Sequence, residues 1–326
     1  MFDVAATNVI EEFPLSIQKD DLLGLRLVAR QSLTPRDVML YALSVGLGSD
    51  PLDERQLSFV YEERLQAVPS MAITLCYPPA LLESYIRAGI QPHRVLHGQQ
   101  RFVLLRALPV SASLEGVTTI TGLEDKGEGR GLLIHYETAI SDLADGSQVA
   151  SLESSSFCLD EGGAGSCGIV PTRDPKVTPK ATPKATPKAT LNAIPATEPD
   201  LTWDCSTLPQ AALLYRLSGD YNPLHASPTS ARAAGYERPI LHGRCTFGMA
   251  AHAILRTCCD YDPTRLEEMS ARFTGVVFPG ETLRTDIWTR SDGLQFKVRV
   301  VERDRVVLDA GWARLRGSCG GMTSTH

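Results

Sequence analysis

The chain has 326 residues, of which 43% are hydrophobic and 21% are charged, and its formal net charge is −6. This composition is typical of a globular protein with one large or two modest domains. The negative net charge argues against extended nucleic-acid binding, which requires a basic surface. It leaves open a small anionic ligand held by a local basic patch. No apolar run approaches the ~20 residues of a membrane-spanning helix.

Eight cysteines are distributed along the chain, and none of them forms a C-x-x-C pair. We interpret them as free thiols of an intracellular protein rather than as zinc ligands or a disulfide framework. No secretory leader is recognised. The chain ends in Ser324-Thr325-His326, which differs from the Ser-Lys-Leu type of peroxisomal address. We therefore expect a protein of the cytosol, or of an organelle reached by another signal.

A low-complexity tract divides the chain into two halves. The quartet Thr-Pro-Lys-Ala occurs three times in succession over 178–189, and such a tract cannot bury a core. The glycine-rich segment at 162–168 lacks the Lys-Ser/Thr pair and the following helix of a phosphate loop, which favours a flexible linker. The predicted units are an N-terminal half over 1–160, a linker over 161–199 and a C-terminal half over 200–320.

The N-terminal half contains a predicted helix followed by predicted strands. The segment from Thr34 to Ser44 repeats the pattern of Thr207 to Ser218, a predicted helix of the C-terminal half. Farther along, Phe102 to Pro109 precedes a strand as Arg272 to Pro279 does. The strands are expected at about 113–124, 131–141 and 147–159.

Two shorter helices are predicted early in the C-terminal half. Ser206 or Thr207 caps the first, and Pro209 lies in its first turn. Its expected buried stripe consists of Ala211, Leu214 and Leu217. Ser227-Pro228 begins the second helix, which Gly235 ends.

A longer helix is predicted from about Gly243, because apolar residues recur at three- and four-residue spacing and give it a deeply apolar face. These residues are Phe247, Ala250, Ala251, Ile254, Leu255 and Cys258. Four strands with period-two alternation follow, as expected for an antiparallel sheet with one covered face. They are predicted at about 270–278, 282–290, 294–302 and 305–315. One buried helix beside a long meander predicts an α+β fold in which the sheet wraps around the helix.

Asp220, Asn222 and His225 place a carboxylate, an amide and an imidazole within six residues of one another. The glycine before them and the proline between them favour a tight turn. A carboxylate and an imidazole can hold one water and exchange its proton, while Asn222 can hold the water or orient His225. Gly243, at a helix start, offers a backbone N–H to an oxygen that gains negative charge. These groups suit addition of water to a double bond conjugated to a thioester, which requires no metal.

Structural interpretations compete with this one. An Asp-x-Asn pair is often a turn or cap, since both side chains bond their own backbone. As metal ligands, the polar trio would lack a third strong ligand. We interpret His97 and His242 as structural. Cys245 lies near a helix start, which can activate a thiol, but no matched His-Asp arrangement accompanies it.

The N-terminal half repeats the pattern of the C-terminal half without its polar cluster. On this alignment Gly46 occupies the position of Asp220, and no Asn-Pro-x-His follows it. We interpret the chain as a duplicated fold in which the N-terminal half is degenerate. Our hypothesis is that this half widens a pocket for a bulky substrate.

The polar cluster and its surroundings resemble a known family. The segment from Tyr215 to His225 resembles the hydratase 2 motif of R-specific enoyl-CoA hydratases, the MaoC-like family, and Pro239 to Gly248 is also similar to it. The likeness extends to the hydratase 2 portion of peroxisomal multifunctional enzymes of type 2, and covers nearly the whole chain apart from the Thr-Pro-Lys-Ala tract. The further segments that carry it are 271–273, 277–283, 39–43, 59–62 and 95–100.

The resemblance implies a double hot-dog fold, with two antiparallel sheets each wrapped on a central helix. It implies reversible hydration of trans-2-enoyl-CoA to (3R)-3-hydroxyacyl-CoA. By matching position, Asp220 and His225 would be the catalytic pair, Asn222 their support and the Gly243 N–H the oxyanion donor. The N-terminal half would line the acyl pocket. No cofactor and no metal are expected, because CoA is part of the substrate.

Other functions remain as alternatives: an acyl-thioester hydrolase, a dehydratase of carrier-bound 3-hydroxyacyl intermediates, or a non-catalytic acyl-CoA binding module. The expected partner is an acyl-CoA thioester, without nucleic acid or a membrane span, and a homodimer is compatible with the fold. The compartment would be cytoplasmic or peroxisomal. An acid–base role of His225 predicts a bell or shoulder in the pH profile near neutrality. Basic candidates for the CoA phosphates are Arg244, Arg272, Lys297 and Arg299, although a solvated face is the default for each.

Overall fold

The computed structural model describes residues 19–159, 161–163, 165–169 and 194–317. The repeated tract at 178–189, predicted to be a linker, lies outside the described residues. Among the helices of the described ranges, none combines the length and the apolarity that crossing a bilayer requires.

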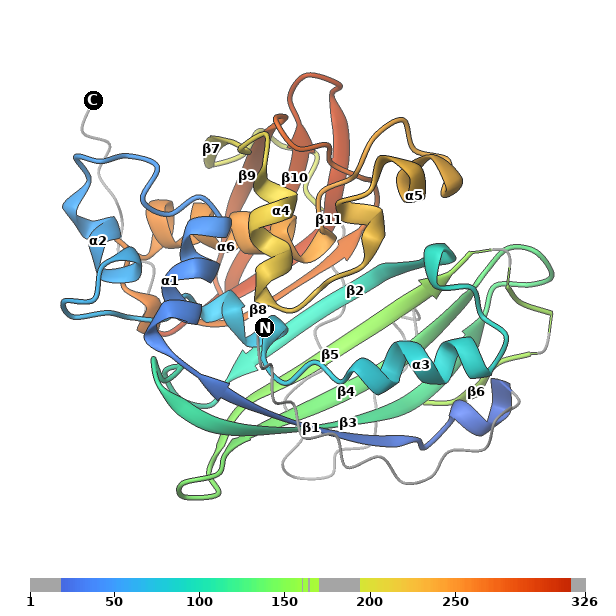
Figure 1. Ribbon diagram of the computed structural model, residues 1–326. Helices are drawn as coiled ribbons and strands as arrows, with labels where there is room; N and C mark the ends of the chain where they lie inside the picture. Colours follow the sequence, from blue (N-terminus) through green and yellow to red (C-terminus); the bar gives the residue numbers. More distant parts are fainter. Residues whose placement is uncertain (1–18, 160, 164, 170–193, 318–326) are drawn as a thin grey trace.

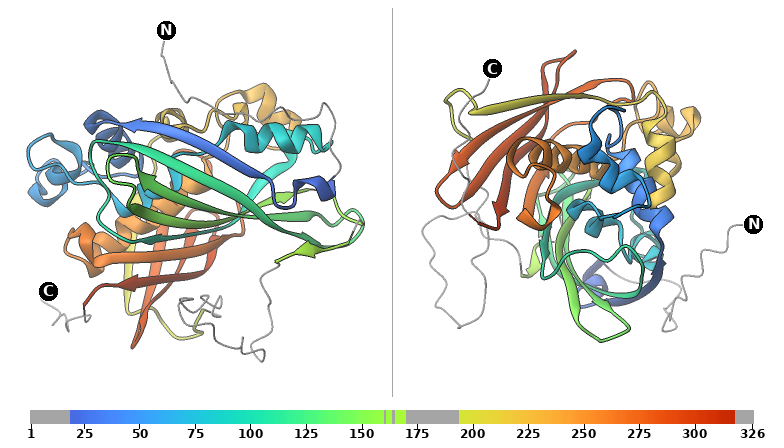
Figure 2. Two further views of the ribbon diagram at one scale, coloured as in Figure 1. Left: turned by 90° about the horizontal axis from the view of Figure 1, so that it is seen from below. Right: turned by 90° about the vertical axis from the view of Figure 1, so that its left-hand side faces the viewer.

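The strands pair into one antiparallel sheet in the order β1-β3-β4-β5-β2-β8-β11-β10-β9-β7, and β6 pairs with β3. Figures 1 and 2 show that this sheet curls around the helices of both halves. The strands of the N-terminal half are β1 (Arg26–Leu33), β2 (Val95–Leu104), β3 (Ala112–Asp125), β4 (Leu132–Asp142), β5 (Gln148–Cys158) and β6 (Cys167–Gly168). Those of the C-terminal half are β7 (Leu201–Ser206), β8 (Leu266–Phe273), β9 (Thr282–Arg290), β10 (Gly293–Val300) and β11 (Arg305–Leu315).

The helices are short, apart from one. The α-helices are α1 (Pro35–Ser44), α2 (Glu54–Val60), α3 (Pro79–Arg87), α4 (Ala211–Tyr215), α5 (Pro228–Ala233) and α6 (Gly243–Cys258). Short 3-10 turns connect them at Lys19–Leu22, Pro69–Thr74, Pro92–Arg94, Arg216–Ser218, Pro223–His225 and Pro263–Arg265.

Helix α6 is the central helix of the C-terminal half. Of its 16 residues, 13 are buried, so the helix is enclosed by the C-terminal strands and by α1 rather than covered on one face only. Gly248 allows α1 to approach closely, because a Cβ at this position would lie 2.5 Å from Val45 Cγ1 and 2.8 Å from Tyr41 Oη. The contact joins the two halves through their helices as well as their strands.

The N-terminal half covers its sheet with the nine-residue α3, which lies across β3 and β4 in Figure 1. A second hydrophobic cluster lies beneath it, in which Leu81 and Tyr85 of α3 pack with Ile120, Ile134 and Tyr136 of the strands.

One strand pairing joins the two halves into a continuous sheet. β2 of the N-terminal half runs antiparallel to β8 of the C-terminal half, with five residue pairs from Gln99↔Arg272 to Val103↔Glu268. The Glu268 carboxylate is fully buried there and accepts a 2.7 Å ion-paired hydrogen bond from Arg101 Nε. Arg314 of β11 also pairs with it. Two helix-wrapping sheets joined edge to edge are a double hot-dog, as predicted from the family resemblance.

The described part of the glycine-rich segment after β5 is attached to the N-terminal sheet. The amides of Gly163 and Gly165 donate to Asp125 Oδ2 at 2.9 and 2.6 Å, and Cys167–Gly168 pair with β3 as β6. This part of the predicted linker packs on the sheet because a distant carboxylate gathers its amides, which composition alone does not signal.

Several predicted elements are confirmed and two are wrong in extent. The strand expected at about 270–278 is β8, which runs from Leu266 to Phe273 and ends before the loop at 274–281. The three strands expected in the N-terminal half correspond to β3, β4 and β5, and Ser227 caps α5 as predicted. The helix expected over 207–218 is only α4, because the Thr207 hydroxyl donates to the Glu281 carbonyl at 2.9 Å instead of capping a helix. Leu217, expected to be buried, is 51% exposed.

Candidate active site

The turn that carries the polar trio follows α4 directly. Gly219 has a φ of +115°, a left-handed conformation that glycine adopts without strain. Asp220 Oδ1 then accepts from the Asn222 amide at 3.2 Å, and Asn222 Oδ1 accepts from the Leu224 amide at 3.0 Å. The capping interpretation of Asp-x-Asn therefore holds for one oxygen of each side chain. It leaves the Asn222 NH2 group and the second Asp220 oxygen available to a ligand.

The His225 imidazole is held in a defined tautomer. Its Nδ1 lies 2.9 Å from the Ile240 carbonyl oxygen, and because a carbonyl can only accept, Nδ1 carries the proton. In the neutral ring Nε2 is therefore an unprotonated acceptor. Burial lowers the pKa of His225 below its ordinary value, although the Asp220 carboxylate opposes this. The neutral, basic form of His225 prevails at neutral pH.

His242, the residue before α6, is part of this arrangement rather than a remote structural histidine. Its Nε2 donates to the Asp220 backbone carbonyl at 3.1 Å, and its ring stacks on that of His225 with centroids 3.7 Å apart. Nδ1 is buried and has no hydrogen-bond partner within the described ranges. Burial lowers the pKa of His242 to about 3, so this ring is neutral and supports the turn.

The Asp220 carboxylate is ionised at neutral pH. Burial raises its pKa, but the surrounding imidazoles, with His242 first, and the Arg244 guanidinium outweigh that effect and lower the pKa. Arg244 is buried behind the site, where its guanidinium lies 4.7 Å from the centre of the Tyr77 ring and donates to Tyr136 Oη at 3.3 Å. An anionic carboxylate thus lies beside a neutral imidazole.

Gly243 begins α6 and lies on the wall of the same site. The first N–H groups of a helix have no intrahelical acceptor, and the Gly243 N–H finds none elsewhere in the described part of the chain. A Cβ at Gly243 would lie 3.1 Å from the Phe273 ring, so a side chain would crowd this approach. The free amide at the positive end of a 16-residue helix suits an oxygen that becomes negative.

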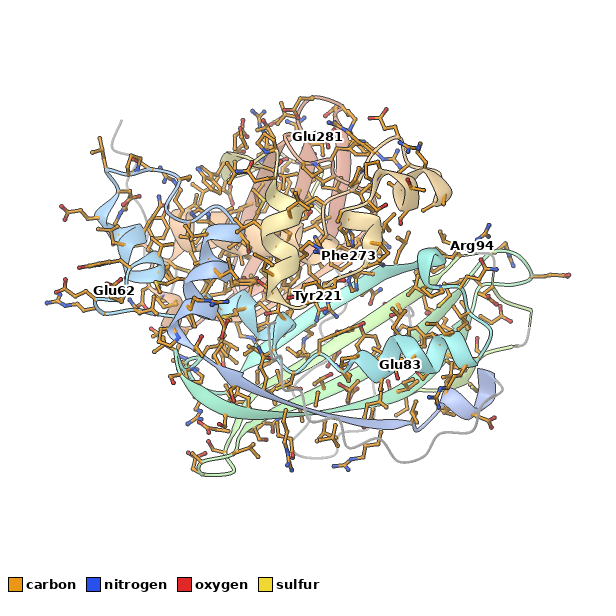
Figure 3. The ribbon with its side chains drawn as sticks, in the orientation of Figure 1. Glu62, Glu83, Arg94, Tyr221, Phe273 and Glu281 are labelled. Carbon is orange, nitrogen blue, oxygen red and sulfur yellow. The ribbon has the colours of Figure 1, made fainter. Side chains whose placement is uncertain are left out.

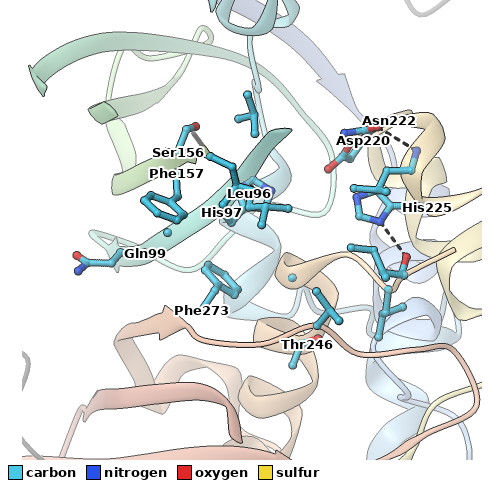
Figure 4. A pocket seen from close by; sticks show the side chains of 18 of the residues that line it. Leu96, His97, Gln99, Ser156, Phe157, Asp220, Asn222, His225, Thr246 and Phe273 are labelled. Carbon is cyan, nitrogen blue, oxygen red and sulfur yellow. Dashed lines mark hydrogen bonds between the residues drawn. The ribbon is translucent and has the colours of Figure 1, made fainter. Parts of the chain in front are cut away.

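These groups open into a cavity of about 790 Å³ between the two halves. Asp220, Asn222, His225 and Gly243 line it from the C-terminal half. The N-terminal half contributes residues of α3, β2 and β5, and those of β2 and β5 lie across the cavity from Asp220 and His225 in Figure 4. They include Leu82, Val95, Leu96, His97, Ser156 and Phe157. Tyr221 and Phe273, labelled in Figure 3, lie where the two halves meet.

The three residues of the polar trio line one cavity, together with residues from elsewhere in the chain that the sequence prediction did not include. His97, interpreted as structural, lines the cavity. Of the basic candidates, Arg272 lines it, and so does Lys126, which was not considered. Lys297 and Arg299 instead face Asp286 on the C-terminal sheet. Gly46, which the sequence alignment places at the position of Asp220, packs near Cys205 and His252 and does not line the cavity.

His242 also provides the third donor that the trio lacked as a metal site. Three donor atoms, one from each of Asp220, His225 and His242, lie within 4.8 Å of one another. The ring stacking, with planes only 25° apart, works against this use. Lone pairs that bind one metal converge on a point, whereas stacked rings direct theirs nearly in parallel. The arrangement favours proton transfer over metal binding.

Comparisons with known proteins agree with this geometry. Two family models match the chain: the MFE-2 hydratase 2 N-terminal domain over residues 32–160, and the MaoC like domain over residues 178–310. The peroxisomal enoyl-CoA hydratase 2 of Arabidopsis thaliana is 37% identical, over 88% of this chain and 92% of its own.

Solved structures extend the likeness to the fold. The crystal structure of a MaoC-like dehydratase from Phytophthora capsici gives a TM-score of 0.75 at 29% identity, covering 93% of this chain and 100% of that one. Full-length peroxisomal multifunctional enzyme type 2 from Drosophila melanogaster gives 0.72 at 29% identity, over 89% of this chain and 48% of that one. Both halves of the molecule are matched, and the chain belongs to the enoyl-CoA hydratase 2 family of MaoC-like proteins.

Proposed function

We propose that the protein is a hydro-lyase that adds water reversibly to trans-2-enoyl-CoA and forms (3R)-3-hydroxyacyl-CoA. The observation that carries the proposal is the pairing of an ionised Asp220 with a neutral His225 in one cavity, beside the free amide of Gly243. Relatives whose names state enoyl-CoA hydratase activity support the substrate class.

The chemistry follows from the protonation states of the two side chains. A water held between Asp220 and His225 Nε2 attacks C3 of the substrate and gives one proton to Nε2. The electrons of the double bond move onto the thioester oxygen, where the Gly243 N–H stabilises the enolate. The imidazolium, stabilised by Asp220, then returns one proton to C2. The bonds to C3 and C2 form on the same face, and the site regains its original charge without a cofactor.

The cavity has room for the two ends of the substrate. We infer that the apolar residues of the N-terminal half receive the acyl chain, and that Lys126 and Arg272, the two cations on the cavity wall, approach the CoA portion. Arg272 is paired with Asp309 at 2.8 Å, which orients its guanidinium. Asn222 would support the water through its free NH2 group.

The proposal is tested with the purified full chain and crotonyl-CoA or longer enoyl-CoAs. Wild-type protein should remove the absorbance of the conjugated thioester and yield the (3R) alcohol. Asp220→Asn and His225→Gln, which preserve shape, should each lower kcat by about 10²-fold or more, because each removes a proton-transfer or charge-stabilising group. Circular dichroism checks that both variants fold.

Other outcomes identify other functions. An unchanged rate in either variant would contradict the role of that residue, and a (3S) product would contradict the stereochemistry. Release of free CoA, detected with a thiol reagent, would indicate a thioester hydrolase. Turnover only on carrier-protein thioesters would indicate a dehydratase of carrier-bound intermediates. Binding of acyl-CoA without turnover at any chain length would indicate a non-catalytic module.

We infer a compartment from the relatives, since the fold does not bear on it. The Arabidopsis relative is peroxisomal by its name, which supports the peroxisome over the cytoplasm. Imaging of the full chain with a tag at either end tests this choice.

A further inference from the structure

Strand β2 contains an irregularity next to the cavity. Its pairing with β5 shifts register between His97 and Gln99, which makes Gly98 a β-bulge. A Cβ at Gly98 would lie 2.7 Å from both Leu133 Cδ2 and Ser155 Oγ, so a larger residue here would force these two side chains to move. A bulge re-aims the neighbouring side chain, and the His97 ring faces the cavity, opposite Asp220 and His225 (Figure 4).

The His97 imidazole has no hydrogen-bond partner in the described part of the chain. Its ring contacts Phe273, with centroids 5.8 Å apart, but both nitrogens are left for a ligand. Burial, and next the Arg244 guanidinium, lower the pKa of His97 to about 3. The ring is therefore neutral at working pH and presents one N–H donor. A neutral imidazole can polarise a carbonyl group without exchanging its proton.

Phe273 relates His97 to the proposed oxyanion donor. Both His97 and Gly243 lie against this one ring, the first from β2 of the N-terminal half and the second from the start of α6. Both also line the cavity. A thioester oxygen beside Phe273 is therefore approached by a donor from each half of the molecule.

We propose that His97 is a further catalytic residue, whose N–H donates a second hydrogen bond to the thioester oxygen and completes, with the Gly243 amide, a two-donor oxyanion site. The inference rests on the proposed hydration reaction. The negative charge on the enolate oxygen is then shared by a backbone amide of one half and a side chain of the other. The half that lacks the acid–base pair would contribute directly to the chemical step.

Substitution of His97 gives the kinetic test with enoyl-CoA. His97→Leu should lower kcat by about 10²-fold or more, the usual cost of losing one oxyanion donor, with a much smaller change in KM. His97→Asn and His97→Gln restore an N–H near the position of one or the other ring nitrogen, and at least one should recover about tenfold. His252→Gln, at a buried imidazole that does not line the cavity, is the matched control and should stay within about threefold of wild type.

Two further readouts separate donation from other roles. The amide variant that recovers activity should show the same dependence of kcat/KM on pH as wild type. A hydrogen-bond donor that does not titrate adds no pKa to this profile. Bound acetoacetyl-CoA, a 3-oxoacyl thioester, should show a weaker enolate absorbance band in His97→Leu than in wild type at the same pH.

The outcomes are distinguishable. Equal losses in the leucine and amide variants, or an unchanged enolate band, would overturn the role of His97. Failure of wild-type protein to hydrate any enoyl-CoA would overturn the proposed reaction, and with it this role. Hydration that survives in His97→Leu at the wild-type rate would overturn the role of His97 alone.

Discussion

At the scale of single residues, two backbone carbonyls determine what the site can do. The carbonyl of Ile240 accepts from His225 Nδ1, and that of Asp220 accepts from His242 Nε2. Each bond fixes one tautomer and leaves the other nitrogen as an acceptor in the neutral ring. Of these two rings only that of His225 lines the cavity, so only its acceptor nitrogen can reach a substrate water. This difference separates the proposed base from the imidazole that supports it.

The pH dependence of activity is predicted from these states. Activity requires neutral His225 and ionised Asp220. Burial lowers the pKa of His225 below its ordinary 6.5, and the pKa of Asp220 is lowered to about 2. Activity should therefore be retained as the pH falls through 6.5 and be lost only at more acidic pH. The sequence predicted a shoulder of the pH–activity profile near neutrality. The lowered pKa of His225 shifts the expected shoulder to more acidic pH.

A series of kcat/KM values between pH 4 and pH 8 measures this dependence, and rapid return to neutral pH checks that the enzyme survives each exposure. A midpoint above 6.5 would show that His225 is not the buried, neutral base described here. A value of kcat/KM that stays constant from pH 4 to pH 8 would show that His225 does not act as an acid or base.

At the scale of elements, the junction of β2 with β8 depends on buried charges. Glu268 is fully buried and pairs with Arg101 and with Arg314. A buried carboxylate is costly to desolvate, and removing it leaves two cations without their partner. The junction of the two halves is therefore sensitive to a single side chain.

Glu268→Ala should lower the free energy of unfolding by about 3–5 kcal/mol, measured by urea denaturation. Glu153→Ala is the matched control, because Glu153 pairs with the same Arg101 but is 39% exposed. It should cost about 1 kcal/mol or less. Equal effects of the two variants would mean that burial of Glu268 adds nothing to the strength of the junction.

The elements also show what sequence patterns can and cannot predict. β3 alternates between buried and less buried positions over most of its length, and α6 carries a repeated apolar pattern, so local periodicity sufficed for these two elements. β2 was missed because its bulge at Gly98 interrupts the alternation. The role of His97 was missed for the same reason, since its direction depends on that bulge and on a partner half about 120 residues away in sequence. Asp220, Asn222 and His225 were found because they share one turn.

At the scale of the whole molecule, buried imidazoles connect stability to pH. Burial lowers the pKa of His242 to about 3 and that of His252 to about 4, from an ordinary 6.5. As the pH falls below 6.5, the unfolded chain binds protons that these rings in the folded protein do not. Each ring should therefore lower the free energy of unfolding by up to about 1.4 kcal/mol per pH unit, until its folded pKa is reached.

Urea denaturation at pH 7.5, 6.5 and 5.5 measures this dependence. The free energy of unfolding should change little between the first two values and fall at the third. His252→Gln, remote from the cavity, should weaken the fall by removing one of the contributing rings. Equal stability at pH 7.5 and 5.5 would contradict the assignment of neutral buried histidines.

The outer strands of the sheet, β1 and β7, bear on the predicted homodimer. A strand with one unpaired side can join another chain. Light scattering of the full chain distinguishes a monomer from a dimer, and a monomer would show that the second half takes the place of a partner.

The five residue pairs between β2 and β8 have a consequence for chemistry as well as for folding. Along a strand, two residues span about 6.8 Å, so sliding these strands by a single repeat of the pleat would carry His97 that far from Asp220. The register between β2 and β8 therefore fixes the distance between His97 of the N-terminal half and Asp220 of the C-terminal half. An insertion within this strand pairing would therefore displace the His97 imidazole even if each sheet kept its curvature around its helix.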